Sequence, residues 1–524
     1  MVDGWRPTGF DVQLTFNESL TEITKARTEI SIQILKENLS TIDLDFGEMP
    51  VDAVTIAGQP AQFTRSPGLL TVQLPAAQPK DIRFAIVVEY HGKPKDGLVL
   101  GPDKDGRPSA TGDNWPNRVH QWIPCLDHPS AKAPVRFTVT APRRDLVVAN
   151  GSLGGVRDAS ATERTWTYNE AVPIPAYCMV VGVAEYARSE PAQAALTPLW
   201  YYVPQSDASF AAQGFGPAGP AIKFYSDTIA PYPYEKLALI IGATRFGGME
   251  NSSAIVFASG LFNQRGGAQN MSRAFNIREG IEDVVAHEIA HQWFGDSVTE
   301  STWSDLWLSE GFATYFAGLF VERHDGEDAF RAYMKRAAAT YFNFEKQNLR
   351  PIHDTETEDL FQLLNPNNYQ KGAWVLHMLR SQLGNDAFFR GLRAYYVAHQ
   401  SGNASTEDLR AALEKASRRD LKQFFARWIY GTGHPQYDLS WGTAEYSGAG
   451  GSLVITLKQT QPGDAFLDPI QIEIVSPKGI QRRWIMPKSK VNTDSFPFKA
   501  DDVPTAVRLD PNDLLLKEVT SRPQ

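Results

Sequence analysis

The sequence predicts a multidomain α+β protein, with a β-rich N-terminal region, a mostly helical middle and a small β-rich C-terminal region. Two observations lead to this fold class. The chain has 524 residues, more than one hydrophobic core usually serves, so two to four domains are expected. The period of its apolar residues also changes twice along the chain, from two to helical spacing and back to two.

Residues 1–195 are expected to form an N-terminal antiparallel β-sheet domain. Apolar and polar residues alternate over 30–34, 82–90 and 137–139, which is the pattern of half-buried strands. Clusters of glycine and proline, such as 66–68, separate these runs and are typical of the turns between antiparallel strands.

The middle domain is expected over 196–435, after a Gly/Pro/Ala-rich stretch at 205–220 that is interpreted as a linker. Ser405 and Asp408 have the spacing of a capping box at the start of its last helix. Helical patterns cover 219–230, 272–295, 303–323, 326–345, 369–383, 386–399 and 406–429.

Residues 436–524 return to the strand pattern, and their length suits a small β-sandwich. Apolar residues alternate over 453–457 and 470–474.

Charge and composition exclude several classes of function. The net charge of -9 argues against a nucleic-acid partner, and no apolar run has the length of a transmembrane segment. Residues 1–10 lack the basic and apolar stretches of a signal peptide, which leaves a cytoplasmic and an exported protein both open. Cys125 and Cys178 are too few for a disulfide scaffold, although one bridge between them stays possible. The oligomeric state is left open.

The stretch His287-Glu288-Ile289-Ala290-His291 carries the strongest chemical signal. On a helix, residues four apart lie on one face, so His287 and His291 can present two imidazoles to one metal ion. Glu288 is rotated by about 100° and lies beside the ion, where it can take a proton from a bound water.

A catalytic zinc ion takes three protein ligands and keeps one position open. Glu310 is the candidate for the third ligand, because eighteen residues separate it from His291 and it lies in a second helical pattern. The ligand types indicate one zinc ion by default, although cobalt or manganese can occupy such a site.

Two further segments are weak signals when each is considered alone. The glycines of Gly247-Gly248-Met249-Glu250 allow a close backbone approach to a ligand, and Glu250 could bind a cation. Tyr369 begins a helical pattern, and its phenol could stabilise an oxyanion near the metal.

In this order, the motifs resemble those of the gluzincin zinc aminopeptidases, the relatives of membrane alanyl aminopeptidase, puromycin-sensitive aminopeptidase and leukotriene A4 hydrolase. The resemblance covers nearly the whole chain. It is carried by the segments above and by HEIAHQWFGD at 287–296, DLWLSEGFATY at 305–315 and IPCLDHPSAK at 123–132.

The resemblance implies a thermolysin-like catalytic domain over 196–435 and peptide substrates with a free N-terminus. It makes His287, His291 and Glu310 the zinc ligands. Glu288 becomes the general base and Tyr369 the stabiliser of the oxyanion.

By the same resemblance, Glu250 anchors the free α-amine of the substrate. Gly247 and Gly248 hold its extended N-terminal residues, with Met249 beside them in the substrate-binding segment. Asp296 and Asp305 are candidates for supporting the metal ligands.

The chain departs from the family pattern in three places. Residues 113–118 replace a Gln-x-Glu segment that contributes to binding the amine or the first side chain, so the preferred first residue stays open. Ser309 stands where the family has asparagine. The long helical C-terminal domain of large members has no counterpart in these residues, which leaves the cleft open or covered by a partner chain.

Two other functions compete with the aminopeptidase. One is an endopeptidase or epoxide hydrolase with the same metal chemistry; the segment at Glu250 argues against a pure endopeptidase, and nothing marks the epoxide-hydrolysing branch. The other is a non-catalytic zinc scaffold or peptide-binding module. It predicts the loss of a ligand, the base or the tyrosine, and all of these are present.

Overall fold

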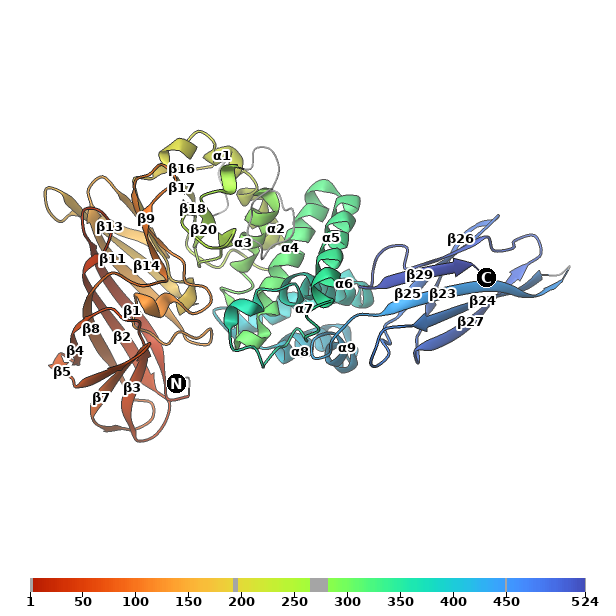
Figure 1. The fold of residues 1–524 in the computed structure, drawn as a ribbon, viewed down its shortest axis with the longest axis horizontal. Helices are drawn as coiled ribbons and strands as arrows, with labels where there is room; N and C mark the ends of the chain where they lie inside the picture. Colours follow the sequence, from red (N-terminus) through yellow and green to blue (C-terminus); the bar gives the residue numbers. More distant parts are fainter. Residues whose placement is uncertain (1–2, 192–196, 264–280, 448–449, 524) are drawn as a thin grey trace.

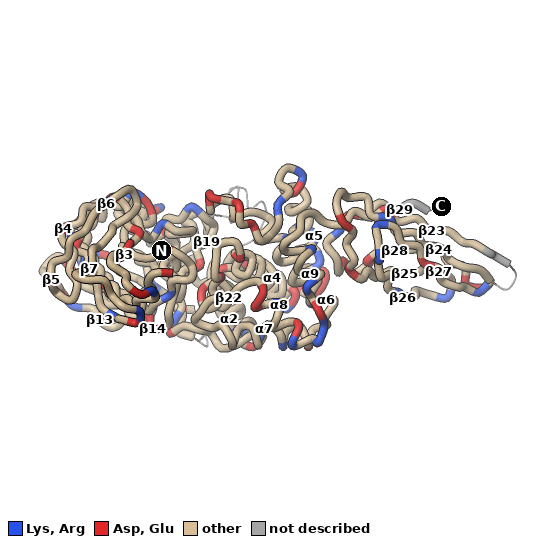
Figure 2. The backbone as a smooth tube through the Cα atoms, turned by 90° about the horizontal axis from the view of Figure 1, so that it is seen from below, with Lys and Arg blue, Asp and Glu red and all other residues tan. Residues whose placement is uncertain are grey.

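The computed structural model describes residues 3–191, 197–263, 281–447 and 450–523. Three regions follow one another along the long axis of the molecule, with strands at both ends and helices in the centre (Figure 1). The view turned by 90° shows the same row (Figure 2). The predicted α+β class is thereby confirmed. The predicted boundary at 195 lies outside the described residues. Within the described ranges, no helix is long and apolar enough to span a bilayer.

The N-terminal region is built on a sheet of eight strands that is mostly antiparallel, with a parallel pair between β1 and β11. Every second residue of its central strands is buried, as the alternation predicts. In spatial order the strands are β13 (Ser152–Asp158), β14 (Glu163–Pro175), β11 (Lys132–Pro142), β1 (Trp5–Phe16), β2 (Ile23–Ile34), β8 (Arg83–Gly92), β4 (Val51–Ile56) and β5 (Gln59–Pro60).

Two smaller sheets complete this region. One has the order β3 (Leu39–Asp45), β7 (Leu69–Gln78), β6 (Phe63–Ser66). The other has the order β12 (Leu146–Ala149), β15 (Val181–Ala184), β10 (Pro108–Gly112), β9 (Leu98–Pro102).

A five-stranded sheet introduces the catalytic region, and its last strand, β19, lies at the metal centre. Within the described part of the chain, β19 pairs with β20 alone, in antiparallel orientation, and so forms one end of the sheet. The spatial order is β16 (Ala187–Ser189), β17 (Leu199–Val203), β18 (Leu237–Gly242), β20 (Ala254–Ala258) and β19 (Gly248–Met249).

The interpretation of 205–220 as a linker is wrong. This stretch contains the short helix α1 (Ala211–Gly214) and the start of α2 (Ala218–Thr228). Phe215 is fully buried between them. The small residues that resemble a linker in composition allow these turns to pack closely on the sheet.

The central helices follow the predicted pattern with two differences. The predicted segment 272–295 is described from Ile281 only, and its helix ends at His291. The predicted helix 406–429 is two helices, because Arg418 has a left-handed φ of 58° that ends the first one. The helices are α3 (Ile281–His291), α4 (Trp307–Asp325), α5 (Glu327–Glu345), α6 (Gly372–Leu383), α7 (Asn385–His399), α8 (Thr406–Ser417) and α9 (Lys422–Trp428).

The starts of α8 and α6 each have a distinct local structure. The capping box at Ser405 and Asp408 is present, with both reciprocal hydrogen bonds. A π-helical turn over Asn367–Lys371 precedes α6 and carries Tyr369. Such turns often occur at functional sites, and this one directs the phenol toward α4.

The C-terminal strands form two sheets whose inward residues join the apolar core of the helical region. Alternate residues of the central strands are fully buried, including Leu453, Ile455 and Ile472. The sheets have the orders β27 (Val491–Lys499), β24 (Gly450–Gln459), β23 (Gln436–Ser447), β29 (Glu518–Pro523) and β26 (Gly479–Ile485), β25 (Ile470–Ser476), β28 (Ala506–Leu509).

Candidate metal centre

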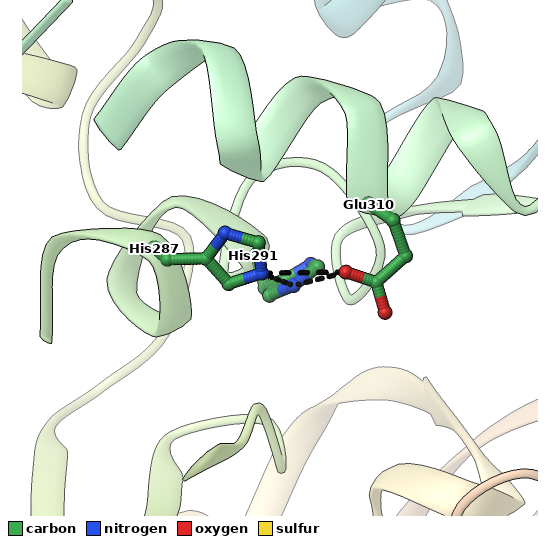
Figure 3. Close-up of side chains that lie close together, drawn as sticks. All are labelled: His287, His291 and Glu310. Carbon is green, nitrogen blue, oxygen red and sulfur yellow. Dashed lines mark hydrogen bonds and ion pairs between the residues drawn. The ribbon is translucent and has the colours of Figure 1, made fainter. Parts of the chain in front are cut away.

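Helices α3 and α4 bring the three predicted ligands together. Figure 3 shows His287 and His291 on α3 pointing toward Glu310 on α4. The two Nε2 atoms lie 3.1 Å apart, and each is 3.3 Å from Oε2 of Glu310. All three side chains are buried.

These separations fit a zinc ion. Four ligands at about 2.0–2.1 Å in a tetrahedron stand about 3.3 Å from one another. Two imidazole nitrogens and one carboxylate oxygen at that spacing are the donor set of a catalytic zinc site, which leaves a position open.

The tautomer of His291 is fixed for metal binding. Its Nδ1 lies 3.1 Å from the carbonyl oxygen of Phe294 and 3.0 Å from Oγ of Ser309. A carbonyl oxygen only accepts, so Nδ1 carries the proton and Nε2 offers its lone pair to the metal. Ser309, which replaces the asparagine of the family pattern, therefore contacts a ligand directly.

Tyr369 is held against the third ligand. Its hydroxyl donates to Oε1 of Glu310 over 2.7 Å, and its ring lies parallel to that of His287. This contact depends on two glycines, since a Cβ atom on Gly311 would lie only 2.9 Å from Cα of Gly372. Burial raises the pKa of the Tyr369 phenol well above its usual range, so the group stays a proton donor.

Glu288 lies under strand β19. A Cβ atom on Gly248 would stand 2.4 Å from Oε1 of Glu288, so only glycine permits this approach. Burial raises the pKa of the Glu288 carboxyl, and the neighbouring carboxylate of Glu250 adds to the shift. A carboxyl group with a raised pKa is suited to accepting a proton.

Glu250 follows β19 and is 5% exposed. Its position is set by Gln292, a residue that the sequence analysis did not single out. Nε2 of Gln292 donates to the carbonyl oxygen of Glu250 at 2.9 Å and to Oδ2 of Asp296 at 2.8 Å. Its Oε1 accepts from the backbone of Ser253 and the hydroxyl of Tyr232. The signal in the sequence that could have pointed to Gln292 was its position directly after His291.

The two aspartates proposed as supports bond to other groups instead of the ligand histidines. Asp296 accepts from Gln292 and from the thiol of Cys178. Asp305 contacts Nδ1 of His353 and accepts from Thr406, at the start of α8. Cys178 and Cys125 are both free thiols, so the possible bridge does not form.

A small cavity of about 20 Å³ joins these groups. It is lined by all of the predicted site residues except Gly247, whose carbonyl bonds to the neighbouring strand β20. Three apolar residues that were not predicted complete the walls, namely Trp115, Phe246 and Leu364.

Two histidines and a glutamate at ligand spacing, with a second glutamate beside them, define the centre of a metallohydrolase. Comparison with known proteins narrows this class. The Peptidase M1 N-terminal domain matches residues 6–178, and the Peptidase family M1 domain matches residues 215–428. The chain belongs to peptidase family M1, which confirms the resemblance inferred from its motifs.

Several relatives carry names that describe peptidases. Tricorn protease-interacting factor F2 of Thermoplasma acidophilum is 27% identical over 405 residues, 75% of this chain and 50% of that protein. Probable aminopeptidase 2 of Sulfurisphaera tokodaii is 29% identical, over 66% of this chain and 45% of that protein. Aminopeptidase M1-C of rice (Oryza sativa subsp. japonica) is 30% identical, over 60% of this chain and 36% of that protein. The aligned parts thus span half of these relatives or less.

Proposed function

We propose that this chain is a zinc-dependent aminopeptidase that removes the N-terminal residue from peptides. The observation that carries the proposal is one cavity that holds the three-ligand group, a buried glutamate, a tyrosine hydroxyl and a second buried carboxylate. Membership of peptidase family M1 and the names of the relatives support it.

His287, His291 and Glu310 would hold the zinc ion. When bound, zinc polarises the scissile carbonyl and lowers the pKa of the attacking water. Glu288 takes the proton of that water and passes it to the leaving amine. The Tyr369 hydroxyl, which bonds to Glu310 in this structure, turns its hydrogen bond to the oxyanion as it develops.

Glu250 supplies the selectivity for a free N-terminus. Its buried carboxylate pairs with the protonated α-amine in a charge-assisted contact, which places the first peptide bond at the metal. The outer edge of β19 is available to bond an extended peptide in this register.

The test compares free and N-acetylated peptides with the zinc-loaded protein. We expect cleavage of free peptides one residue at a time, loss of activity with a chelator, and recovery with zinc. Glu250→Ala should lose most of its activity on free peptides while retaining zinc. Equal cleavage of blocked and free peptides would identify an endopeptidase instead, and zinc binding without any turnover would identify a non-catalytic scaffold.

A further inference from the structure

Trp115 lines the same cavity as Glu250. It belongs to the segment 113–118, which stands where the family pattern has Gln-x-Glu. The side chain is 2% exposed, so it is a fixed part of the interior. This segment therefore contributes an indole ring to the site, and no carboxylate from it lines the cavity.

Three aromatic rings hold the indole in place. Its centroid lies 5.7 Å from that of Trp303, 6.1 Å from Phe246 and 6.2 Å from Phe361, all in edge-to-face arrangements. Such contacts fix the orientation of a ring as well as its burial. The wall cannot move aside easily for a larger substrate.

The backbone of the segment is held by a buried ion cluster. Nε of Arg118 donates to the carbonyl oxygen of Trp115 at 2.8 Å. The same guanidinium pairs with Asp113 at 2.9 Å and with Asp96 at 2.5 Å. Arg245 pairs with the same two aspartates, and none of these four charged residues lines the cavity.

Among the described residues, the cavity lining offers no spare charge to a substrate side chain. Three of its lining residues are carboxylates with assigned tasks: Glu310 is a metal ligand, Glu288 the base and Glu250 the amine anchor. Among the described lining residues there is no lysine or arginine. The walls that remain for a side chain are apolar, namely Trp115, Phe246, Met249 and Leu364.

The cavity is also small. Its volume of about 20 Å³ is little more than the roughly 10–15 Å³ that a single water molecule requires. Pockets for larger ligands usually have about 300–1,000 Å³. Burying an unpaired charge against the apolar walls is costly, and a long side chain meets the fixed indole.

From these contacts we infer that Trp115 determines specificity and restricts the enzyme to peptides with a small, uncharged first residue, such as alanine, glycine or serine. This inference rests on the proposed aminopeptidase function. It names the substrate class that the centre accepts and the residue that excludes the others.

The experiment measures kcat/KM on p-nitroanilides of alanine, leucine, phenylalanine, arginine and glutamate. For the unchanged protein we expect kcat/KM on the alanine substrate to exceed that on the arginine and glutamate substrates by about 100-fold. The charged side chains of the latter two find no partner in the cavity. In Trp115→Ala, kcat/KM for the leucine and phenylalanine substrates should rise by about tenfold or more relative to kcat/KM for the alanine substrate. Trp115→Glu should raise arginine relative to alanine.

Trp484→Ala is the matched control, because Trp484 is 50% exposed on strand β26 and does not line the cavity. It should leave the order of substrates unchanged. If Trp115→Ala does not fold, as judged by its thermal midpoint, Trp115→Leu keeps an apolar but smaller wall and provides the same test.

The two proposals fail in different ways. Absence of turnover on every free-amine substrate by the zinc-loaded protein would overturn the aminopeptidase function itself. Cleavage of arginine or glutamate substrates as fast as alanine would overturn only the inference about Trp115. The same holds if folded Trp115 variants keep the original order of substrates.

Discussion

The metal centre has two halves that differ in how the chain builds them. The ligand half consists of His287, Glu288, His291 and Glu310, which lie within 24 residues on two successive helices. The proposed recognition half consists of Gly248, Glu250 and Trp115, which line the same cavity. Trp115 is 135 positions before Glu250 and belongs to the N-terminal region.

The residues proposed to carry out the reaction are thus placed differently from the residues proposed to select the substrate. Helix geometry places His287 and His291 on one face of α3, and the packing of α4 against α3 adds Glu310. The recognition half exists only where strand β19 and the segment 113–118 meet over the helices. A substitution in one half should therefore change the rate of chemistry, and a substitution in the other should change which substrates react.

Glu288→Gln should have the largest effect, because it removes the proton acceptor and leaves the shape of the ligand half intact. We expect turnover of an alanine p-nitroanilide to fall by about 10³-fold or more, with one zinc ion per chain retained. Steady-state kinetics and metal analysis on one preparation check this. Activity close to that of the unchanged protein would contradict the assignment of the base.

Gly248→Ala tests the point where the two halves touch. Its methyl group would press on the Glu288 carboxyl, so we expect turnover to fall by about 100-fold without loss of zinc. Gly155→Ala is the matched control, because a Cβ atom there meets no atom within 4 Å. Equal activities of the two variants would show that β19 does not lie against the base in solution.

The sequence was sufficient for the ligand half and insufficient for much of the recognition half. The spacing of four residues predicted that His287 and His291 converge, because local geometry governs the pair, and the family resemblance supplied Glu310 as the third ligand. Gln292 was missed, since its four partners come from different elements and only the fold assembles them. The role of Trp115 was missed for the same reason.

The fold shows the same division. The alternation over 30–34 and the capping box at Ser405 are local signals, and both predictions hold. The break at Arg418 has no glycine or proline to announce it; there the packing of two helices overrides a continuous helical pattern. Composition made 205–220 resemble a linker, whereas burial against the sheet orders it.

Gln292→Met tests the connection between the halves. It nearly keeps the volume of the side chain but removes the hydrogen bond that Gln292, the residue after α3, donates to the Glu250 carbonyl oxygen. We expect KM for free-amine substrates to rise about tenfold, with a smaller change in kcat and no loss of zinc. Gln382→Met, which removes an amide contact to Asp468 far along the chain, is the control and should leave KM unchanged. A fall in kcat alone would place Gln292 in the ligand half.

Lys132→Met should leave both halves intact and affect only the scaffold. Nζ of Lys132 on β11 donates to the carbonyl oxygens of Asp296, Ser297 and Gly402 at 2.7, 2.9 and 3.1 Å. The N-terminal sheet is thereby joined to the segment that follows α3. Loss of these bonds should lower the free energy of unfolding by roughly 1–3 kcal/mol, while kcat/KM of the folded protein stays unchanged.

The pH dependence of the stability lost in Lys132→Met is the more specific test. Burial of the amino group lowers the pKa of Lys132 to about 7 in the folded protein, below the value of about 10.4 expected in the unfolded chain. Between these values the unfolded chain binds more protons, so the stability that Lys132 contributes rises with pH. Denaturation should show that the difference in free energy of unfolding between the unchanged protein and Lys132→Met is larger at pH 9 than at pH 7. Lys223→Met, which removes an exposed ion pair with Asp227, is the control for the loss of a lysine elsewhere on the surface. A gap that is constant over this range would mean that Lys132 stays charged in the fold, held by its three carbonyl partners.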